Sequence, residues 1–212
     1  MKVIPSIAQV EAQAFKTQQI AFCVLSLFVI AALLILHAIF APLLGEPTRA
    51  VILILASGFG WKAAEVIWLQ RHRDGISART AQIETAVSVI GLFALAAVLA
   101  FLTNKDDPPY FVLLAIPILQ VAYHCSFVIT NLTIAAAIAM MFAWSSFYFA
   151  VHPPPRATQY LETGMIAVIY CLTGPLVWYL VNQLRRKGHE RRLRPTYVRR
   201  ERSSRMATRC WT

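Results

Sequence analysis

The sequence has little charge for its length. Only 14% of its 212 residues are Asp, Glu, Lys or Arg, whereas 58% are hydrophobic, and the mean hydropathy is +0.58. So little polar material cannot cover the surface of a soluble core. The composition therefore excludes an ordinary soluble globular domain and predicts a membrane protein.

The chain also lacks the motifs of soluble catalysis. It has no Walker loop, no Gly-x-Ser-x-Gly, and no His-x-x-x-His or His-Glu-x-x-His spacing. Its cysteines show no Cys-x-x-Cys pair, and three of the four lie in apolar runs, where cysteine behaves as a small hydrophobe. We therefore expect no catalytic residue, no disulfide framework, no metal site and no cofactor in this chain.

Long apolar runs are abundant, and a run of about 20 residues is enough to cross a bilayer. Six runs qualify, at about residues 20–44, 50–69, 83–103, 110–129, 132–151 and 161–181. The fourth and fifth runs form one apolar stretch, and Asn131 is the natural place for a turn between them. No compact basic-then-apolar segment with a cleavage site precedes the first run, so we expect this run to be retained as an anchor.

The prediction is an all-α membrane protein with six transmembrane helices. It divides the chain into a cytoplasmic segment (residues 1–19), a six-span membrane domain (20–181), a cytoplasmic exit helix (182–194) and a disordered basic tail (195–212).

Lys and Arg gather on one side of the predicted bundle. With the N-terminus inside, the inner side holds the C-terminal tail and Lys2, Lys16, Arg71, Arg73 and Arg79, whereas the outer side holds only Arg49, Lys105 and Arg156. Because cytoplasmic loops carry the excess of Lys and Arg, we expect both termini on the cytoplasmic side of the membrane.

Positive charge is concentrated after the last span. Residues 182–212 hold eleven Lys or Arg and two Glu, a balance of +9 out of a net charge of +10. Cations beside apolar runs fit anionic lipid headgroups, so we expect the bilayer as a partner and no nucleic acid. We expect Pro195 to stop the exit helix. The tail beyond it is either a polybasic lipid-binding segment or an out-of-frame translation of its gene.

Polar residues inside the spans are the candidate functional residues, because burying charge at membrane depth is expensive. Lys62 and Glu65 lie three residues apart, close enough for an ion pair. They either form a ligand or proton site, or, more commonly, extend toward Gln70 and Arg71 at the membrane edge.

The fourth span carries a second polar group. Pro117 predicts a kink, and Gln120 and His124 share a helix face, as a polar pocket or an interhelical contact requires. The candidate signal-sensing residues are Lys62, Glu65, Gln120, Tyr123 and His124.

The order of features resembles the six-helix membrane input region of bacterial sensor histidine kinases. The resemblance lies in the basic inner loop QRHRDGISARTAQIE, in Leu102 and Thr103 ending the third span, in the acidic turn at residues 106–109, in the Ile116, Pro117, Ile118 step, and in a last span that runs straight into NQLRRKGHERRLR. The resemblance covers about residues 20–194. The kinase core of those proteins has no counterpart in this sequence.

The resemblance implies a sensory or anchoring domain that acts as a homodimer. The last span would continue as a cytoplasmic helix, beginning with Gln183, Leu184, Arg185 and Arg186, and would transmit the signal by rotation or sliding. A response regulator would be a partner only if a kinase core were restored. Two alternatives remain open: a small transporter or channel that uses Lys62, Glu65, Glu84 and His124 as a relay, and a membrane anchor for another output such as a nucleotide cyclase.

Overall fold

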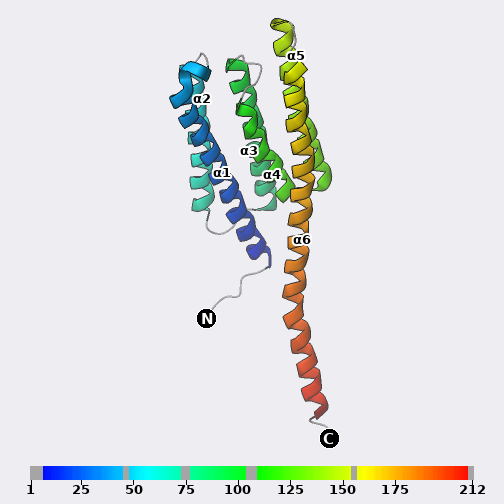
Figure 1. The fold of residues 1–212 in the computed structure, drawn as a ribbon. Coiled ribbons are helices and arrows are strands. Elements are labelled where there is room, and N and C mark those ends of the chain that lie inside the picture. The colour runs from blue at the N-terminus through cyan, green and yellow to red at the C-terminus, as the bar shows by residue number, and fades with distance from the viewer. Residues whose placement is uncertain (1–6, 45–47, 73–76, 104–108, 154–156, 210–212) are drawn as a thin grey trace.

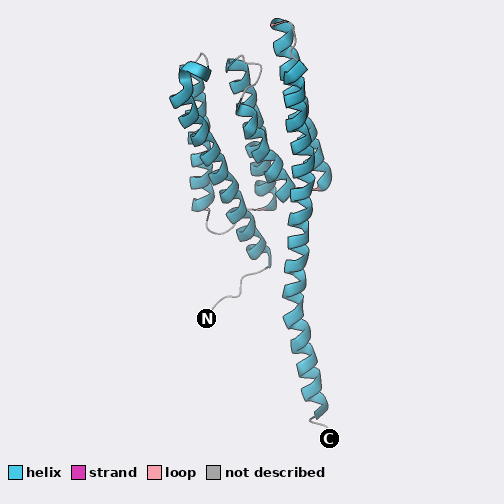
Figure 2. Ribbon diagram, in the orientation of Figure 1, coloured by secondary structure: helices cyan, strands magenta, loops and turns pink. Residues whose placement is uncertain are grey.

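The computed structural model of the chain describes residues 7–44, 48–72, 77–103, 109–153 and 157–209, and within these ranges it is helical with no strand (Figure 2). The elements are α1 (Ile7–Leu44), α2 (Thr48–Arg71), α3 (Ala78–Thr103), the 3₁₀ helix η1 (Pro109–Leu114), α4 (Ala115–His124), α5 (Phe127–Val151) and α6 (Ala157–Arg209). The predicted all-α class is confirmed.

Successive segments run alternately up and down one bundle. α1 packs along α2, α5 packs along α6, and the start of α1 lies at the same end of the bundle as the part of α6 that projects below it (Figure 1). We refer to this as the termini end.

In the described part of the chain, five helices are long and apolar enough to cross a membrane. They span Gln13–Phe40, Arg49–Arg71, Arg79–Thr103, Phe127–Val151 and Ala157–Leu184. Several apolar helices of membrane-spanning length are what a multi-pass membrane protein requires. The expected fourth span is shorter, because η1 and α4 together cover only Pro109–His124.

The turn before α5 lies five or six residues earlier than the sequence predicted. α4 ends at His124, and Ser126 begins α5 by accepting a hydrogen bond from the Ile129 backbone N–H through its side chain. Asn131 therefore lies inside α5, where its side chain donates to the Phe127 carbonyl. The prediction of a turn at Asn131 was wrong because a serine ahead of an apolar run is also a helix-start signal, and here it takes that role.

The η1–α4 segment is the central element of the bundle. It contacts α1, α3, α5 and α6, and ten of its sixteen residues are buried. The change from 3₁₀ to α-helix falls just before Pro117, whose missing N–H cannot bond the Leu113 carbonyl. Because a 3₁₀ turn rises faster than an α turn, the segment is about 27 Å long, close to the thickness of the hydrocarbon core.

Inward-facing positions recur every three or four residues along the first three helices. On α1 they are Gln19, Cys23, Ser26, Ile30, Leu33 and His37; on α2, Val51, Leu55, Gly58, Lys62 and Leu69; on α3, Ala81, Thr85, Ser88, Leu92, Ala96, Leu99 and Thr103. Polar residues gather on these rows between the middle of the bundle and the termini end, at Gln19, Ser26, Lys62, Thr85 and Ser88. Next to them Cys23, Leu69 and Ala81 pack together as an apolar cluster.

The two ends of the chain are more helical than expected. α1 begins at Ile7, inside the segment predicted to precede the membrane domain, and α6 continues through Pro195 to Arg209. The prediction that Pro195 ends the helix and that a disordered tail follows is therefore wrong. Proline removes one intrahelical hydrogen bond, and the flanking Arg, Glu, Met and Ala residues have enough helix propensity to continue on both sides.

Candidate functional site: a buried polar cluster

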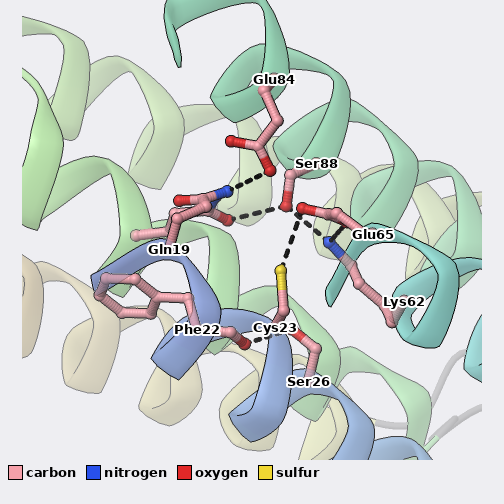
Figure 3. Close-up of polar contacts among 9 residues, drawn as sticks. Gln19, Phe22, Cys23, Ser26, Lys62, Glu65, Glu84 and Ser88 are labelled. Atoms are coloured by element: carbon pink, nitrogen blue, oxygen red, sulfur yellow. Dashed lines mark hydrogen bonds and ion pairs between the residues drawn. The ribbon is translucent and has the colours of Figure 1, made fainter. Parts of the chain in front are cut away.

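Seven polar side chains from four helices meet inside the bundle toward the termini end (Figure 3). This polar cluster consists of Gln19 and Cys23 from α1, Lys62 and Glu65 from α2, Glu84 and Ser88 from α3, and Gln120 from α4. Glu65 lies six residues before the end of α2, and Glu84 lies six residues after the start of α3. The cluster is thus about 9 Å or more inside the ends of these helices.

Lys62 is the central cation of the cluster. Its side chain is 0% exposed, and its Nζ donates to Glu65 Oε2 at 2.7 Å and to Ser88 Oγ at 2.6 Å. The Nζ also lies 4.3 Å from the ring centroid of Trp61. The interpretation that Lys62 extends toward the membrane edge is therefore wrong, because its charge is satisfied inward by a carboxylate and a hydroxyl.

Ser88 extends the network from Lys62 to the central helix. Its hydroxyl accepts from Lys62 and donates to Gln120 Oε1 at 3.1 Å. Of the two interpretations of Gln120, the interhelical contact is thus observed, and it links α4 to the ion pair on α2.

Cys23 and Gln19 bring α1 to the two carboxyl groups. Cys23 Sγ donates to Glu65 Oε1 at 3.1 Å, and Gln19 Nε2 donates to Glu84 Oε1 at 2.8 Å. One ligand atom from each of Cys23, Glu65 and Glu84 lies within 4.8 Å of the others. The thiol of Cys23 and the carboxyl groups of Glu65 and Glu84 are the groups of the cluster that zinc-type ions bind.

The charges of the cluster do not balance by themselves. Lys62 compensates Glu65, which leaves the carboxyl group of Glu84 beside it without a second basic side chain among the cluster members. An uncompensated charge in a low-dielectric interior costs several kcal/mol, on the order of the values measured for buried ions. In this arrangement Glu84 carries a proton, or a further cation sits beside it.

Two amide atoms of the cluster have no hydrogen-bond partner in the described part of the chain. They are Gln19 Oε1 and Gln120 Nε2. Gln19 and Gln120 are 0% and 1% exposed, so each has one polar atom of its side-chain amide buried without a hydrogen bond. Such groups are rare in proteins because each costs about 1–3 kcal/mol, and they point to a bound water, ion or ligand.

Tyr123 and His124 form an aromatic group with Phe15 and Phe22 of α1. The His124 ring lies 4.8 Å from Phe15 and 5.7 Å from Phe22, and Tyr123 lies 5.8 Å from Phe22, measured between centroids. These contacts pack α4 against α1 below the polar cluster.

His37 lies in a different part of the bundle. Its Nδ1 lies 3.3 Å from the hydroxyl oxygen (Oη) of Tyr110, at the start of η1, whereas His124 is the last residue of α4. The two histidines are therefore separated by the length of the central segment and do not form a pair.

The predicted exit residues lie on the part of α6 that leaves the bundle. Leu184 is exposed, and Gln183 Nε2 donates to the Tyr179 hydroxyl one turn earlier. The backbone of Arg185 and Arg186 continues α6, and their side chains lie outside the described residues.

Sequence reasoning found part of this site. It selected Lys62, Glu65 and Gln120 as sensing candidates, and it considered Glu84 only for a transporter. It missed Gln19, Cys23 and Ser88. A usable signal was present: Gln19 and Cys23, like Glu84 and Ser88, are polar residues at i,i+4 spacing and so share one face of an otherwise apolar helix.

Comparison of the chain with protein-family models, with curated proteins and with solved structures finds no match. The function is therefore argued from the site and from α6.

Proposed function

We propose that this chain is the membrane-embedded input domain of a signalling protein, of the kind found in bacterial sensor histidine kinases, and that α6 carries its output. The observation that supports this most directly is the length of α6, 53 residues without a break from Ala157 to Arg209. Beyond Leu184, where the apolar part ends, 25 residues of helix extend about 37 Å away from the bundle. A rigid helix of this kind transmits rotation or sliding of its membrane part.

In this proposal six segments cross a bacterial inner membrane, with η1 and α4 together forming the fourth. Both termini lie in the cytoplasm, since the termini end carries Lys16, Arg71 and Arg79 and is continued by the Arg-rich part of α6. Anionic headgroups would bind the first basic residues of that segment, next to the bundle. Reporter fusions test the topology: phosphatase fused at Lys105 should be active outside, and a fluorescent protein fused after Arg209 should fold inside.

The proposal includes a homodimer formed along α6. Only 11% of the most apolar window of α6 is buried, against 22% to 33% for the other four long spans. Its exposed side chains follow a repeat of four and three residues through Leu161, Met165, Val168, Leu172 and Tyr179, with Pro175 in the same row. This is the spacing of a helix that packs against a second copy of itself.

Cysteine crosslinking tests the dimer. In a cysteine-free background, Leu172→Cys should form a disulfide-linked dimer in membranes, because Leu172 is 67% exposed on this row. Ile166→Cys is the matched control, since Ile166 packs against the core of its own bundle. Equal crosslinking of both variants, or of neither, would argue against a dimer along α6.

A chimera tests the signalling role. The chain up to Arg194 is fused to the core of a known histidine kinase, with zero to seven helix-forming residues inserted at the junction. Kinase output should rise and fall with the helical period, because each added residue rotates the core by about 100°. A four-glycine insert is the control that should uncouple the core. Chimeras that are inserted in the membrane but inactive with every number of inserted residues would contradict the proposal.

A small transporter is the second candidate, and the polar cluster is the observation that favours it. Lys62, Glu65 and Glu84, which a relay would require, do lie together. In proteoliposomes, a transporter should lose flux on Lys62→Ala or Glu65→Ala, whereas an input domain should show no flux and an altered output in the chimera. The same bundle would equally suit another output, such as a nucleotide cyclase.

A further inference from the structure

We propose that Cys23, Glu65 and Glu84, with the side-chain carbonyl of Gln19, bind one divalent transition-metal ion of the zinc type. The proposal concerns the site alone and stands whichever of the functions above is correct. If the chain is an input domain, the ion is its stimulus.

The ligand atoms are close enough for one ion. The Cys23 sulfur and one carboxylate oxygen each from Glu65 and Glu84 lie within 4.8 Å of one another. Around a tetrahedral zinc ion, with bonds of about 2.0–2.3 Å, ligand atoms lie about 3.3–3.7 Å apart. A shift of about 1 Å by side chains on three helices would close the site.

The set of ligands selects the class of ion. A thiolate with carboxylates suits zinc-type ions, whereas Mg²⁺ and Ca²⁺ prefer sites made of oxygen ligands alone. Two carboxylates without the thiol would suit only a hard cation. Cys23 is therefore the residue that gives the site its specificity.

One buried acceptor atom points independently to a cation. Gln19 Oε1 has no donor in the described part of the chain, and Gln19 is 0% exposed. The amide of Gln19 is held beside the Glu84 carboxyl group, because its Nε2 donates to Glu84 Oε1 at 2.8 Å (Figure 3). A metal ion bound by Oε1 as well as by Glu84 would satisfy the acceptor that no donor reaches.

Charge balance also favours a divalent ion. The thiolate and the two carboxylates carry three negative charges, Lys62 supplies one positive charge, and a divalent ion supplies two, so the occupied cluster is neutral. Binding releases the protons of the Cys23 thiol and the Glu84 carboxyl group to solvent. Lys62 is a positioning residue: it bonds Glu65 Oε2 and leaves Oε1 directed at Cys23.

The test uses the purified full-length chain in detergent, with Cys125→Ala, Cys171→Ala and Cys210→Ala to leave Cys23 as the only thiol. Cd²⁺ is titrated as a probe, and the cadmium–thiolate charge-transfer absorption is measured. Zn²⁺ affinity is then obtained by competition. We expect saturation at one ion per chain, and displacement of Cd²⁺ by Zn²⁺ but not by Mg²⁺.

Single substitutions assign the ligands. Cys23→Ser should abolish the absorption and weaken Zn²⁺ binding at least about 100-fold, more than the loss of an outer partner does. Glu84→Gln should weaken it at least about tenfold. Glu162→Gln is the matched control, because Glu162 is exposed at the start of α6, and it should bind as the parent does. Circular dichroism melts establish that each variant is folded.

Three results would overturn the metal site. They are the absence of a saturable cadmium–thiolate band, unchanged Zn²⁺ affinity in folded Cys23→Ser, and equal losses in Glu84→Gln and Glu162→Gln. Binding that depends on Glu84 but not on Cys23 would identify a proton or hard-cation site instead. Since the readout is binding, an inactive kinase chimera has no bearing on it.

Discussion

Replacing Lys62 with methionine tests whether the ion pair is buried inside the bundle. Methionine keeps most of the length of the side chain but removes its charge. It also removes the two hydrogen bonds that Lys62 Nζ donates, to Glu65 Oε2 at 2.7 Å and to Ser88 Oγ at 2.6 Å. Removing one partner of a buried ion pair costs about 3–5 kcal/mol, because the other charge is left uncompensated. Glu65 can take up a proton in response, so we expect about 3 kcal/mol of lost unfolding free energy.

A double-mutant cycle separates the pair from the packing of the site. Glu65→Gln alone should also destabilise, because it leaves Lys62 unpaired at 0% exposure. Lys62→Met with Glu65→Gln removes both charges, and neutral side chains of similar volume are tolerated where a buried pair stood. The double variant should therefore be more stable than the sum of the single losses by about 2 kcal/mol.

The assay is denaturant-induced unfolding in detergent micelles, followed by circular dichroism. Lys16→Met is the matched control: its Nζ donates to the carbonyls of Gln70 and His72 at the exposed end of α2, so its loss should cost about 1 kcal/mol or less. If Lys62→Met is as stable as Lys16→Met, Lys62 does not point into the bundle and the reasoning from the polar cluster fails.

Two further predictions concern close packing and a buried hydrogen bond. Gly91→Ala should destabilise by about 1–3 kcal/mol, because a Cβ there would clash with the Trp61 ring. Gly60→Ala meets nothing within 4 Å and should be neutral or stabilising by up to about 1 kcal/mol. Equal melting shifts for the two variants would contradict this. Tyr170→Phe removes the donor to the Phe111 carbonyl at 2.9 Å and should cost about 1–3 kcal/mol by the same unfolding assay, so an unchanged stability would show that α6 does not pack on η1 in this register.

The sequence predicted the helical class and most helix positions. A span is recognised by the length of its apolar run, and that length depends on the bilayer rather than on neighbouring helices. The turn between the fourth and fifth segments was misplaced because residues 110–151 are apolar throughout. In such a stretch Ser126 and Asn131 are competing signals, and only the packing of α4 between its neighbours decides between them.

The candidate site was predicted only where polar residues are close in sequence. Lys62 and Glu65 are three residues apart, so their pairing follows from helix geometry. Gln19 and Glu84 are 65 residues apart, and no local pattern brings them together.

What the sequence determined by itself is that this chain forms apolar helices of membrane length, with its positive charge concentrated near and beyond one end of the bundle. What the tertiary structure decided is which side of each helix faces inward. In a soluble protein the polar face of a helix marks the outside, but here lipid-facing side chains such as Phe28, Ile90 and Leu132 are as apolar as those in the core. Only packing between helices turns Cys23, Lys62 and Glu84 toward one another.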